Sequence, residues 1–196
     1  MSLLEALDAA EAVLDELGHD WCVIGGLAVA ARTPARFTVD IDLAVAVATD
    51  AQAEAVTMAF VARGFALVAA LEHETTGRLA SVRLQRGPGE EVDLMFALTG
   101  IEPEIVADAV AIELLSNRVA RTATVGHLVA TEVLSADDHR PRDAQDLLAL
   151  LAQANDRELA RAERALRHIE QAGAGRGRDL LSDLTAWRAR AAKESS

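Results

Sequence analysis

The stretch from residue 38 to residue 47, Thr-Val-Asp-Ile-Asp-Leu-Ala-Val-Ala-Val, constrains the fold of this chain more than any other. It is rich in β-branched and apolar residues, and alternation with a period of two is typical of a β-strand. Successive side chains of a strand point to opposite faces, so Ile41 and Leu43 are expected in the core. Asp40 and Asp42 then share the other face. The chain is therefore expected to build a sheet that carries a pair of carboxylates on one strand.

Apolar periodicity, cap signals and Gly or Pro punctuation predict the remaining elements. Helices are expected over 3–17, 27–31, 50–63, 103–115, 126–135, 142–153, 155–171 and 178–192. Further strands are expected over 20–25, 65–71, 79–86 and 91–98, with an extended segment over 118–125. This order predicts an α/β (α+β) fold, in which a mixed, partly antiparallel sheet is flanked by helices and followed by a C-terminal helical part. We expect an α/β domain over residues 1–135 and a helical region over 136–196.

Composition excludes several classes of protein. Half of the 196 residues are apolar, which excludes a disordered chain, and a net charge of −12 argues against a general coat for nucleic acid or anionic membranes. Apolar runs are too short for a membrane helix, and the first residues lack the basic segment of a signal peptide. Cys22 is the only cysteine, which excludes an internal disulfide and a cysteine-built zinc site. A cytoplasmic protein is expected.

Charge is distributed unevenly along the chain. Residues 157–190 contain eight Arg against five acidic residues, whereas the rest of the chain is strongly acidic. Two interpretations follow: an Arg-rich helical surface that simply faces solvent, or a docking surface for an acidic partner or RNA.

The pair Asp40 and Asp42 has a specific chemistry. Two neighbouring carboxylates repel each other, and at least one pKa rises unless something compensates the charge. A divalent cation is the usual compensation, and hard oxygen ligands suit Mg²⁺. The alternative is an acid pair at a solvated strand edge, which is the commoner explanation of an isolated Asp-x-Asp.

Other residues add to this pair. Gly25 and Gly26 lie at a strand-to-helix turn, where glycines let backbone N–H groups approach a phosphate; the alternative is a tight, closely packed turn. Asp93 lies in a later strand on the face opposite Val92 and Leu94, so it either faces water or supplies a third carboxylate. Arg83 shares a face with Asp93 if their strands pair.

The order Gly25-Gly26, thirteen residues, Asp40-Ile41-Asp42 and then Asp93 resembles the nucleotidyltransferase superfamily of the DNA polymerase beta type. The fuller run Arg36-x-Thr38-x-Asp40-Ile41-Asp42 resembles its AbiEii-type branch, which includes toxins of bacterial toxin–antitoxin systems. So does Arg142-Asp143-Ala144-Gln145-Asp146-Leu147, which is similar to an Arg-Asp-x-x-Asp-Leu motif. The match covers about residues 20–151.

The resemblance implies a nucleoside triphosphate substrate and two Mg²⁺ ions held by Asp40, Asp42 and Asp93. Asp93 would help to deprotonate or orient an acceptor hydroxyl, which attacks the α-phosphorus while pyrophosphate leaves. Gly25 and Gly26 would cradle the triphosphate.

The resemblance also implies roles for residues around this centre. Arg36 and Thr38 precede the acid pair, and Arg36, Arg83 or Arg142 would neutralise phosphate charge. Asp143 and Asp146 would belong to the surroundings of the site; the alternative is a local ion pair of Arg142 with Asp146 on a packed helix.

Two functional hypotheses follow. The first is an Mg²⁺-dependent nucleotidyltransferase that acts on a hydroxyl of an RNA, a protein or a small molecule, within a toxin–antitoxin system. The second is a catalytically weakened binding or regulatory module with a protein partner, because Glu132 occupies the position at which the AbiEii-type pattern has a Lys. No membrane partner is expected under either hypothesis.

Overall fold

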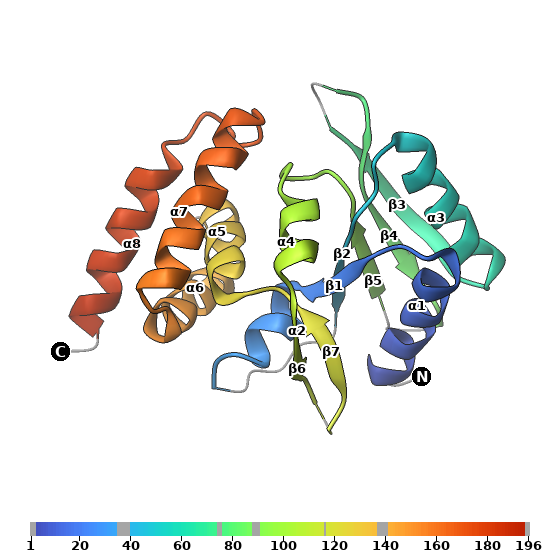
Figure 1. Cartoon of the computed structure of the whole chain (residues 1–196), viewed down its shortest axis with the longest axis horizontal. Helices are drawn as coiled ribbons and strands as arrows, with labels where there is room; N and C mark the ends of the chain where they lie inside the picture. Colours follow the sequence, from blue (N-terminus) through green and yellow to red (C-terminus); the bar gives the residue numbers. More distant parts are fainter. Residues whose placement is uncertain are drawn as a thin grey trace.

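The computed structural model describes residues 3–34, 40–73, 76–87, 91–115, 117–136 and 141–194. These residues form one sheet and two groups of helices (Figure 1). The strands are β1 (Trp21–Ile24), β2 (Ile41–Val45), β3 (Ala66–Glu72), β4 (Leu79–Gln85), β5 (Glu91–Met95), β6 (Val110–Glu113) and β7 (Val119–Thr122). The helices are α1 (Leu3–Leu17), α2 (Gly25–Ala30), α3 (Asp50–Ala62), α4 (Glu102–Asp108), α5 (Val125–Ser135), α6 (Pro141–Gln153), α7 (Asp156–Gln171) and α8 (Leu180–Glu194).

The seven-stranded sheet has the order β3-β4-β5-β2-β1-β7-β6. β2 pairs with β5, and β1 with β7, in parallel, whereas the other neighbours pair antiparallel. This confirms the mixed, partly antiparallel sheet predicted from the order of elements. α1 and α3 pack on one side of the sheet, α4 packs on β1 and β2, and α5–α8 form a separate helical layer at the left of Figure 1.

The alternation in β2 positions the core as predicted. Ile41 and Leu43 are fully buried, and their neighbours in β5, Val92 and Leu94, are buried as well. The opposite face of the same two strands carries Asp42 and Asp93 at facing positions. The packing of the strand face that carries Ile41 and Leu43 therefore fixes which way the acidic residues point.

The helix predicted over 103–115 is wrong in its second half. α4 ends at Asp108, and β6 then forms a hairpin with β7 through a turn in which Asn117 has a φ of 63°. Apolar spacing within 103–115 fits a helix, but β-branched Val110 and Ile112 pair across the hairpin instead. The hydrogen bonds that stabilise β6 come from β7, and the apolar periodicity of residues 103–115 does not reveal them.

An arginine ties the helical layer to the end of α4. Arg161 of α7 is 8% exposed and donates from Nε to Asp108 at 3.0 Å and from Nη1 to Glu158 at 2.5 Å. Glu158 in turn accepts the backbone N–H of Gly126 at 2.7 Å. These bonds join the end of α4 to α7 and to the start of α5. Because α5 packs against α6 and α7, helices from both sides of residue 136 belong to this layer, and the predicted domain division stays a prediction.

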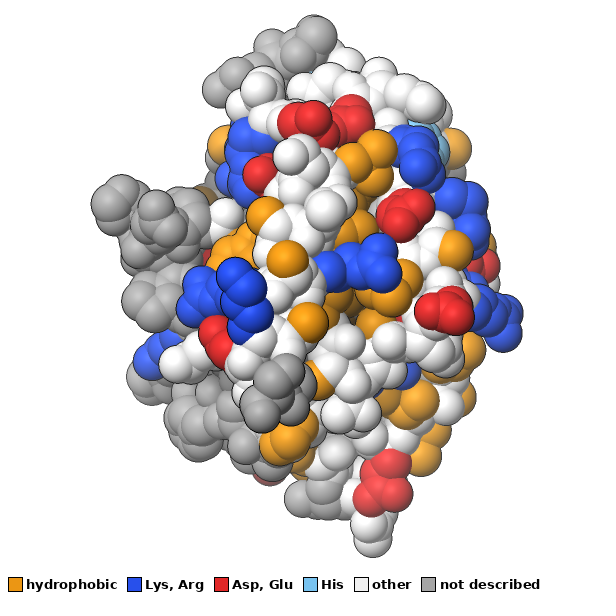
Figure 2. Space-filling model, turned by 90° about the vertical axis from the view of Figure 1, so that its left-hand side faces the viewer, with side chains coloured by type: hydrophobic (Ala, Val, Ile, Leu, Met, Phe, Trp, Pro, Cys, Tyr) orange, Lys and Arg blue, Asp and Glu red, His pale blue; other side chains and the backbone are white. Residues whose placement is uncertain are grey.

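The Arg-rich segment over residues 157–190 belongs to the helical layer, whose surface carries mixed charge. Figure 2 shows blue Lys and Arg side chains interspersed with red acidic and orange apolar ones. Arginines near the C-terminus form local ion pairs, such as Arg178 with Asp183 at 2.9 Å and Arg190 with Glu194 at 3.1 Å. This arrangement favours a solvated helical surface. None of the described helices is both long enough and apolar enough to cross a membrane.

Buried His127 predicts a loss of stability in acid. Its side chain is 0% exposed, with Nδ1 3.1 Å from Thr124 Oγ1 and Nε2 3.3 Å from Glu104 Oε1. Burial lowers the pKa of His127 below its ordinary value, although Glu104 and Asp108 oppose the shift. The unfolded chain therefore binds a proton that the folded chain resists, and stability falls as pH drops below about 6.5, by at most about 1.4 kcal/mol per pH unit.

Urea unfolding at several pH values between 5 and 7 tests this expectation. His127→Gln keeps a hydrogen-bonding side chain and cannot titrate, so its stability should vary less steeply with pH than that of the wild type. Equal pH dependence of the two proteins would show that His127 is not responsible.

Candidate functional site

Four neighbouring strands bring two of the predicted acidic residues, Asp42 and Asp93, into one line across the sheet. Ile24 of β1 faces Asp42 of β2, Asp42 faces Asp93 of β5, and Asp93 faces Arg83 of β4. We call these four residues the transverse row. Arg83 and Asp93 share a face, as the sequence predicts for paired strands, so the row places two carboxylates and one guanidinium side by side.

Gly25 and Gly26 lie against Asp42, where β1 turns into α2. Gly25 has a φ of 57°, and a Cβ at this position would lie 2.6 Å from Asp42 Cγ and overlap Oδ2. Only glycine fits both the left-handed backbone and the close approach. The backbone N–H of Gly26 donates a hydrogen bond to the Asp42 carboxylate. The glycine turn therefore fixes the position of this side chain.

Asp42 is an electrostatically unfavourable carboxylate. Burial raises the pKa of Asp42 from 3.8 to about 7, and the charges of Asp93 and Asp40 add to the rise. The Gly26 hydrogen bond and the Arg83 charge oppose it. Asp40 lies directly before β2 and is exposed. The site thus holds more negative charge than its own residues neutralise.

Asp93 is bound by Arg83. Arg83 Nε donates to Asp93 Oδ1 at 2.8 Å and Nη2 donates to Oδ2 at 2.6 Å, so both carboxylate oxygens accept from one guanidinium. Arg83 Nη1 also lies 3.0 Å from Glu91 Oε2. The hydrogen bond to Asp93 is the main cause that raises the pKa of Arg83 above its ordinary value. Arg83 is therefore a permanent cation at this site.

Glu91 was missed by the sequence-based reasoning, although a signal was present. It precedes Asp93 by two residues on the same strand, so alternation alone places both on one face. Its contact with Arg83 makes it part of the charge balance of the site.

Other predicted site residues lie elsewhere or outside the description. Arg36 and Thr38 fall outside the described residues. Asp143 and Asp146 lie on α6 in the helical layer, where Asp146 is 5% exposed, and Glu132 lies on α5. Among the residues that the structure describes, no three His, Cys, Asp or Glu side chains form a group that could hold one metal ion. The metal-ligand set Asp40, Asp42 and Asp93 stays a prediction.

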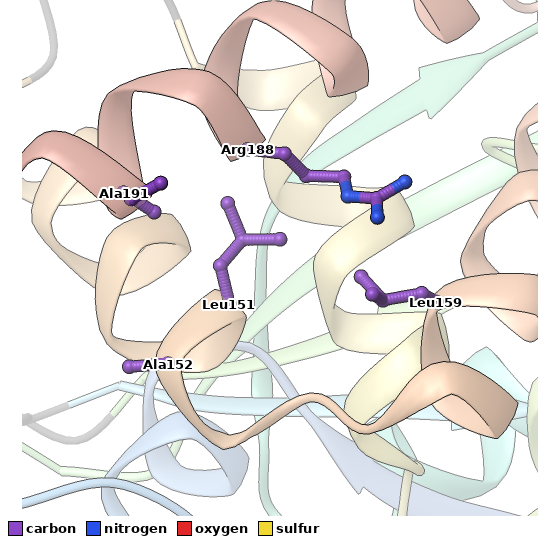
Figure 3. A pocket seen from close by; sticks show the side chains of 6 residues that line it. Leu151, Ala152, Leu159, Arg188 and Ala191 are labelled. Atoms are coloured by element: carbon purple, nitrogen blue, oxygen red, sulfur yellow. The ribbon is translucent and has the colours of Figure 1, made fainter. Parts of the chain in front are cut away.

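Two clefts lie in or beside the helical layer and are lined by other residues. One lies between α6, α7 and α8, where Arg188 extends above Leu151 and Leu159 (Figure 3). The second is lined by residues that include Arg32 and Arg161. The residues of the transverse row do not line either of these clefts. The row lies on a face of the sheet, where 44% of the Arg83 side chain is exposed.

The donor chemistry of Asp42 in the transverse row, together with neighbouring Asp40, fits a divalent cation. The carboxylate oxygens of both residues are hard ligands of the kind that Mg²⁺ prefers. Burial is the main cause that raises the pKa of Asp42, and the charges of Asp93 and Asp40 add to the rise; a bound cation would offset all three. The row therefore combines a charge excess with suitable ligand atoms.

Comparison with known proteins gives weak likenesses. No protein-family model matches the chain, and no curated protein matches it. Among solved structures, it is similar to an antigenic nucleotidyltransferase-like protein from Paracoccidioides brasiliensis (18% identity, TM-score 0.49, covering 92% of this chain and 91% of that one). It is also similar to the antibiotic-resistance factor ANT(2'')-Ia (17%, 0.48, 96% and 90%) and to the lincomycin-bound lincosamide antibiotic adenylyltransferase LnuA (14%, 0.49, 78% and 96%).

Proposed function

We propose that this protein transfers a nucleoside monophosphate from a nucleoside triphosphate to an acceptor hydroxyl. The observation that carries the proposal is the placement of Asp42, which is held by Gly26, crowded by Gly25 and set beside Asp93 in a row with excess negative charge. A glycine turn against a carboxylate pair supplies what this reaction needs: backbone room for phosphates and ligands for a cation.

The residues of the site have distinct roles in this proposal. Asp40, Asp42 and Asp93 would hold Mg²⁺, which supplies charge neutralisation at the phosphates when bound. Gly25 and Gly26 lie against the triphosphate, and Asp93 orients the acceptor hydroxyl for attack on the α-phosphorus while pyrophosphate leaves.

Charged residues around the centre complete the proposed site. Arg83 faces the phosphates from β4. Arg36 and Thr38 precede the acid pair in sequence, and Asp143 and Asp146 on α6 would belong to the wider surroundings of the site. Most of the rate acceleration comes from positioning and charge neutralisation, because phosphoryl chemistry needs little covalent help from the protein.

The acceptor hydroxyl belongs to an RNA, a protein or a small molecule. The AbiEii-like motifs favour a toxin–antitoxin pair in the cytoplasm as the setting, in which a partner protein restrains the transfer. The second candidate is a weakened module that binds nucleotide without transferring it. Glu132 favours that candidate, because it places an acid on α5 where the resembling pattern has a phosphate-side cation.

Incubation with α-labelled ATP, GTP, CTP or UTP, Mg²⁺ and cell extract tests the proposal. Wild-type protein is expected to transfer label to an acceptor, and Asp93→Asn is expected to lose the transfer. Asp20→Asn is the matched control, because 79% of the Asp20 side chain is exposed and the charge change is the same. Nucleotide binding without transfer in the wild type would favour the weakened module, and absence of both would contradict the proposal.

A further inference from the structure

The contact between Arg83 and Asp93 carries a further inference about the cation content of the site. The two side chains face each other across antiparallel β4 and β5, and the guanidinium bonds both carboxylate oxygens at 2.8 Å and 2.6 Å. Such a two-point fork fixes orientation as well as charge. The Asp93 side chain is 11% exposed, whereas 44% of the Arg83 side chain is exposed. Arg83 therefore covers Asp93 from the solvent side.

The same guanidinium is held from a second direction. Its remaining nitrogen, Nη1, lies 3.0 Å from Glu91 Oε2, on the same strand as Asp93. Arg83 thus bridges two carboxylates, in the way that a divalent ion bridges two acidic ligands. Asp42, the next member of the transverse row, receives a backbone N–H from Gly26, and the charge of Arg83 is the smallest of the causes that act on its pKa. The two ends of the carboxylate pair are therefore unequal, since Asp93 is neutralised and Asp42 is not.

From this inequality we infer that Arg83 takes the place of a second divalent ion at Asp93, so that the site binds a single divalent cation, at the Asp40 and Asp42 end. The inference rests on the proposed function and replaces the two ions that the family resemblance implies with one ion and one guanidinium. A second divalent ion at Asp93 would have to share a carboxylate whose two oxygens are already bound to a fixed positive charge. Repulsion between the two cations opposes that arrangement.

Counting Mn²⁺ in the presence of a non-hydrolysable ATP analogue tests the inference. Equilibrium dialysis with saturating analogue on both sides measures the excess Mn²⁺ per protein chain. We expect one ion for the wild type and two for Arg83→Met, which removes the guanidinium. Electron paramagnetic resonance is expected to show coupling between two Mn²⁺ ions in the variant and none in the wild type.

Two further variants serve as controls. Arg83→Lys retains a cation beside Asp93 and is expected to bind one ion, and circular dichroism of Arg83→Met checks that this variant is folded. Arg78→Met removes an arginine that precedes the same strand and whose Nη2 lies 3.5 Å from the Ala48 carbonyl oxygen, so one ion is expected.

The possible outcomes separate the two claims. Two ions in the wild type, or one ion in a folded Arg83→Met, would overturn the role of Arg83 and leave the proposed function intact. If the wild-type protein bound no excess Mn²⁺ over the chamber without protein, both the role of Arg83 and the proposed function would be overturned. Each measurement reports bound metal and does not depend on catalytic turnover.

Discussion

Asp42→Asn is expected to abolish nucleotidyl transfer and, in the absence of metal, to make the protein more stable at pH 8. Burial and neighbouring acids raise the pKa of Asp42 from 3.8 to about 7. The unfolded chain ionises this group near pH 4, but the folded chain resists ionisation until about pH 7, so stability is lost as pH rises through that interval. A pKa rise of this size corresponds to a loss of folding free energy of at most about 4 kcal/mol. Asparagine removes the charge and keeps an oxygen that accepts the Gly26 N–H.

Three measurements check this expectation. Urea unfolding at pH 8 with a chelator should give a higher free energy of unfolding for the variant, and added Mg²⁺ should stabilise only the wild type. Transfer should fall by at least about 100-fold, since loss of charge stabilisation at a phosphoryl site is worth several kcal/mol. Asp20→Asn is expected to change none of these. A variant that is still stabilised by Mg²⁺ would exclude Asp42 from the cation site.

Gly25→Ala is expected to disrupt the site more severely than its single added methyl group suggests. Alanine at a φ of 57° carries a backbone penalty of about 1–2 kcal/mol. Its Cβ would also overlap the Asp42 carboxylate, which is confined by the Gly26 N–H. The carboxylate must move or the turn must open. We therefore expect a clear loss of stability together with loss of Mg²⁺ and nucleotide binding.

Gly18→Ala provides the matched control for this substitution. Gly18 has a φ of 70°, and no atom lies within 4 Å of the position of its added Cβ. It therefore pays the backbone penalty alone and is expected to keep its ligand binding. Thermal unfolding and calorimetric titration with Mg²⁺ and a non-hydrolysable nucleotide compare the two variants. Equal behaviour of both would show that the contact between Gly25 and Asp42 has no role.

Local patterns predicted much of the fold because the alternation of apolar and polar residues in a strand shows which side chains face the core. Alternation placed Asp42 opposite the core residues Ile41 and Leu43, and it placed Arg83 with Asp93 once their strands pair. β6 was missed because its partner strand, not its own periodicity, decides its structure.

The closest contact of the candidate site was beyond sequence reasoning for a similar reason. The approach of Gly25 to Asp42 depends on the antiparallel register of β1 and β2, which sets Ile24 against Asp42. The bond from the Gly26 N–H to Asp42 depends on the same register. A glycine pair in a sequence indicates backbone freedom, but only the register shows which side chain uses the space.

The transverse row also determines when in folding this site can exist. Its members come from positions 24, 42, 83 and 93, so about half of the chain must be in place before the last carboxylate is added. Such distant contacts form only after large loops have closed, which slows folding. β1, α2 and β2 can pair as a local unit, with Asp42 free of the repulsion from Asp93. The repulsion between Asp42 and Asp93 therefore arises only when β5 docks beside β2, and it is absent from any state in which β1 and β2 alone are paired.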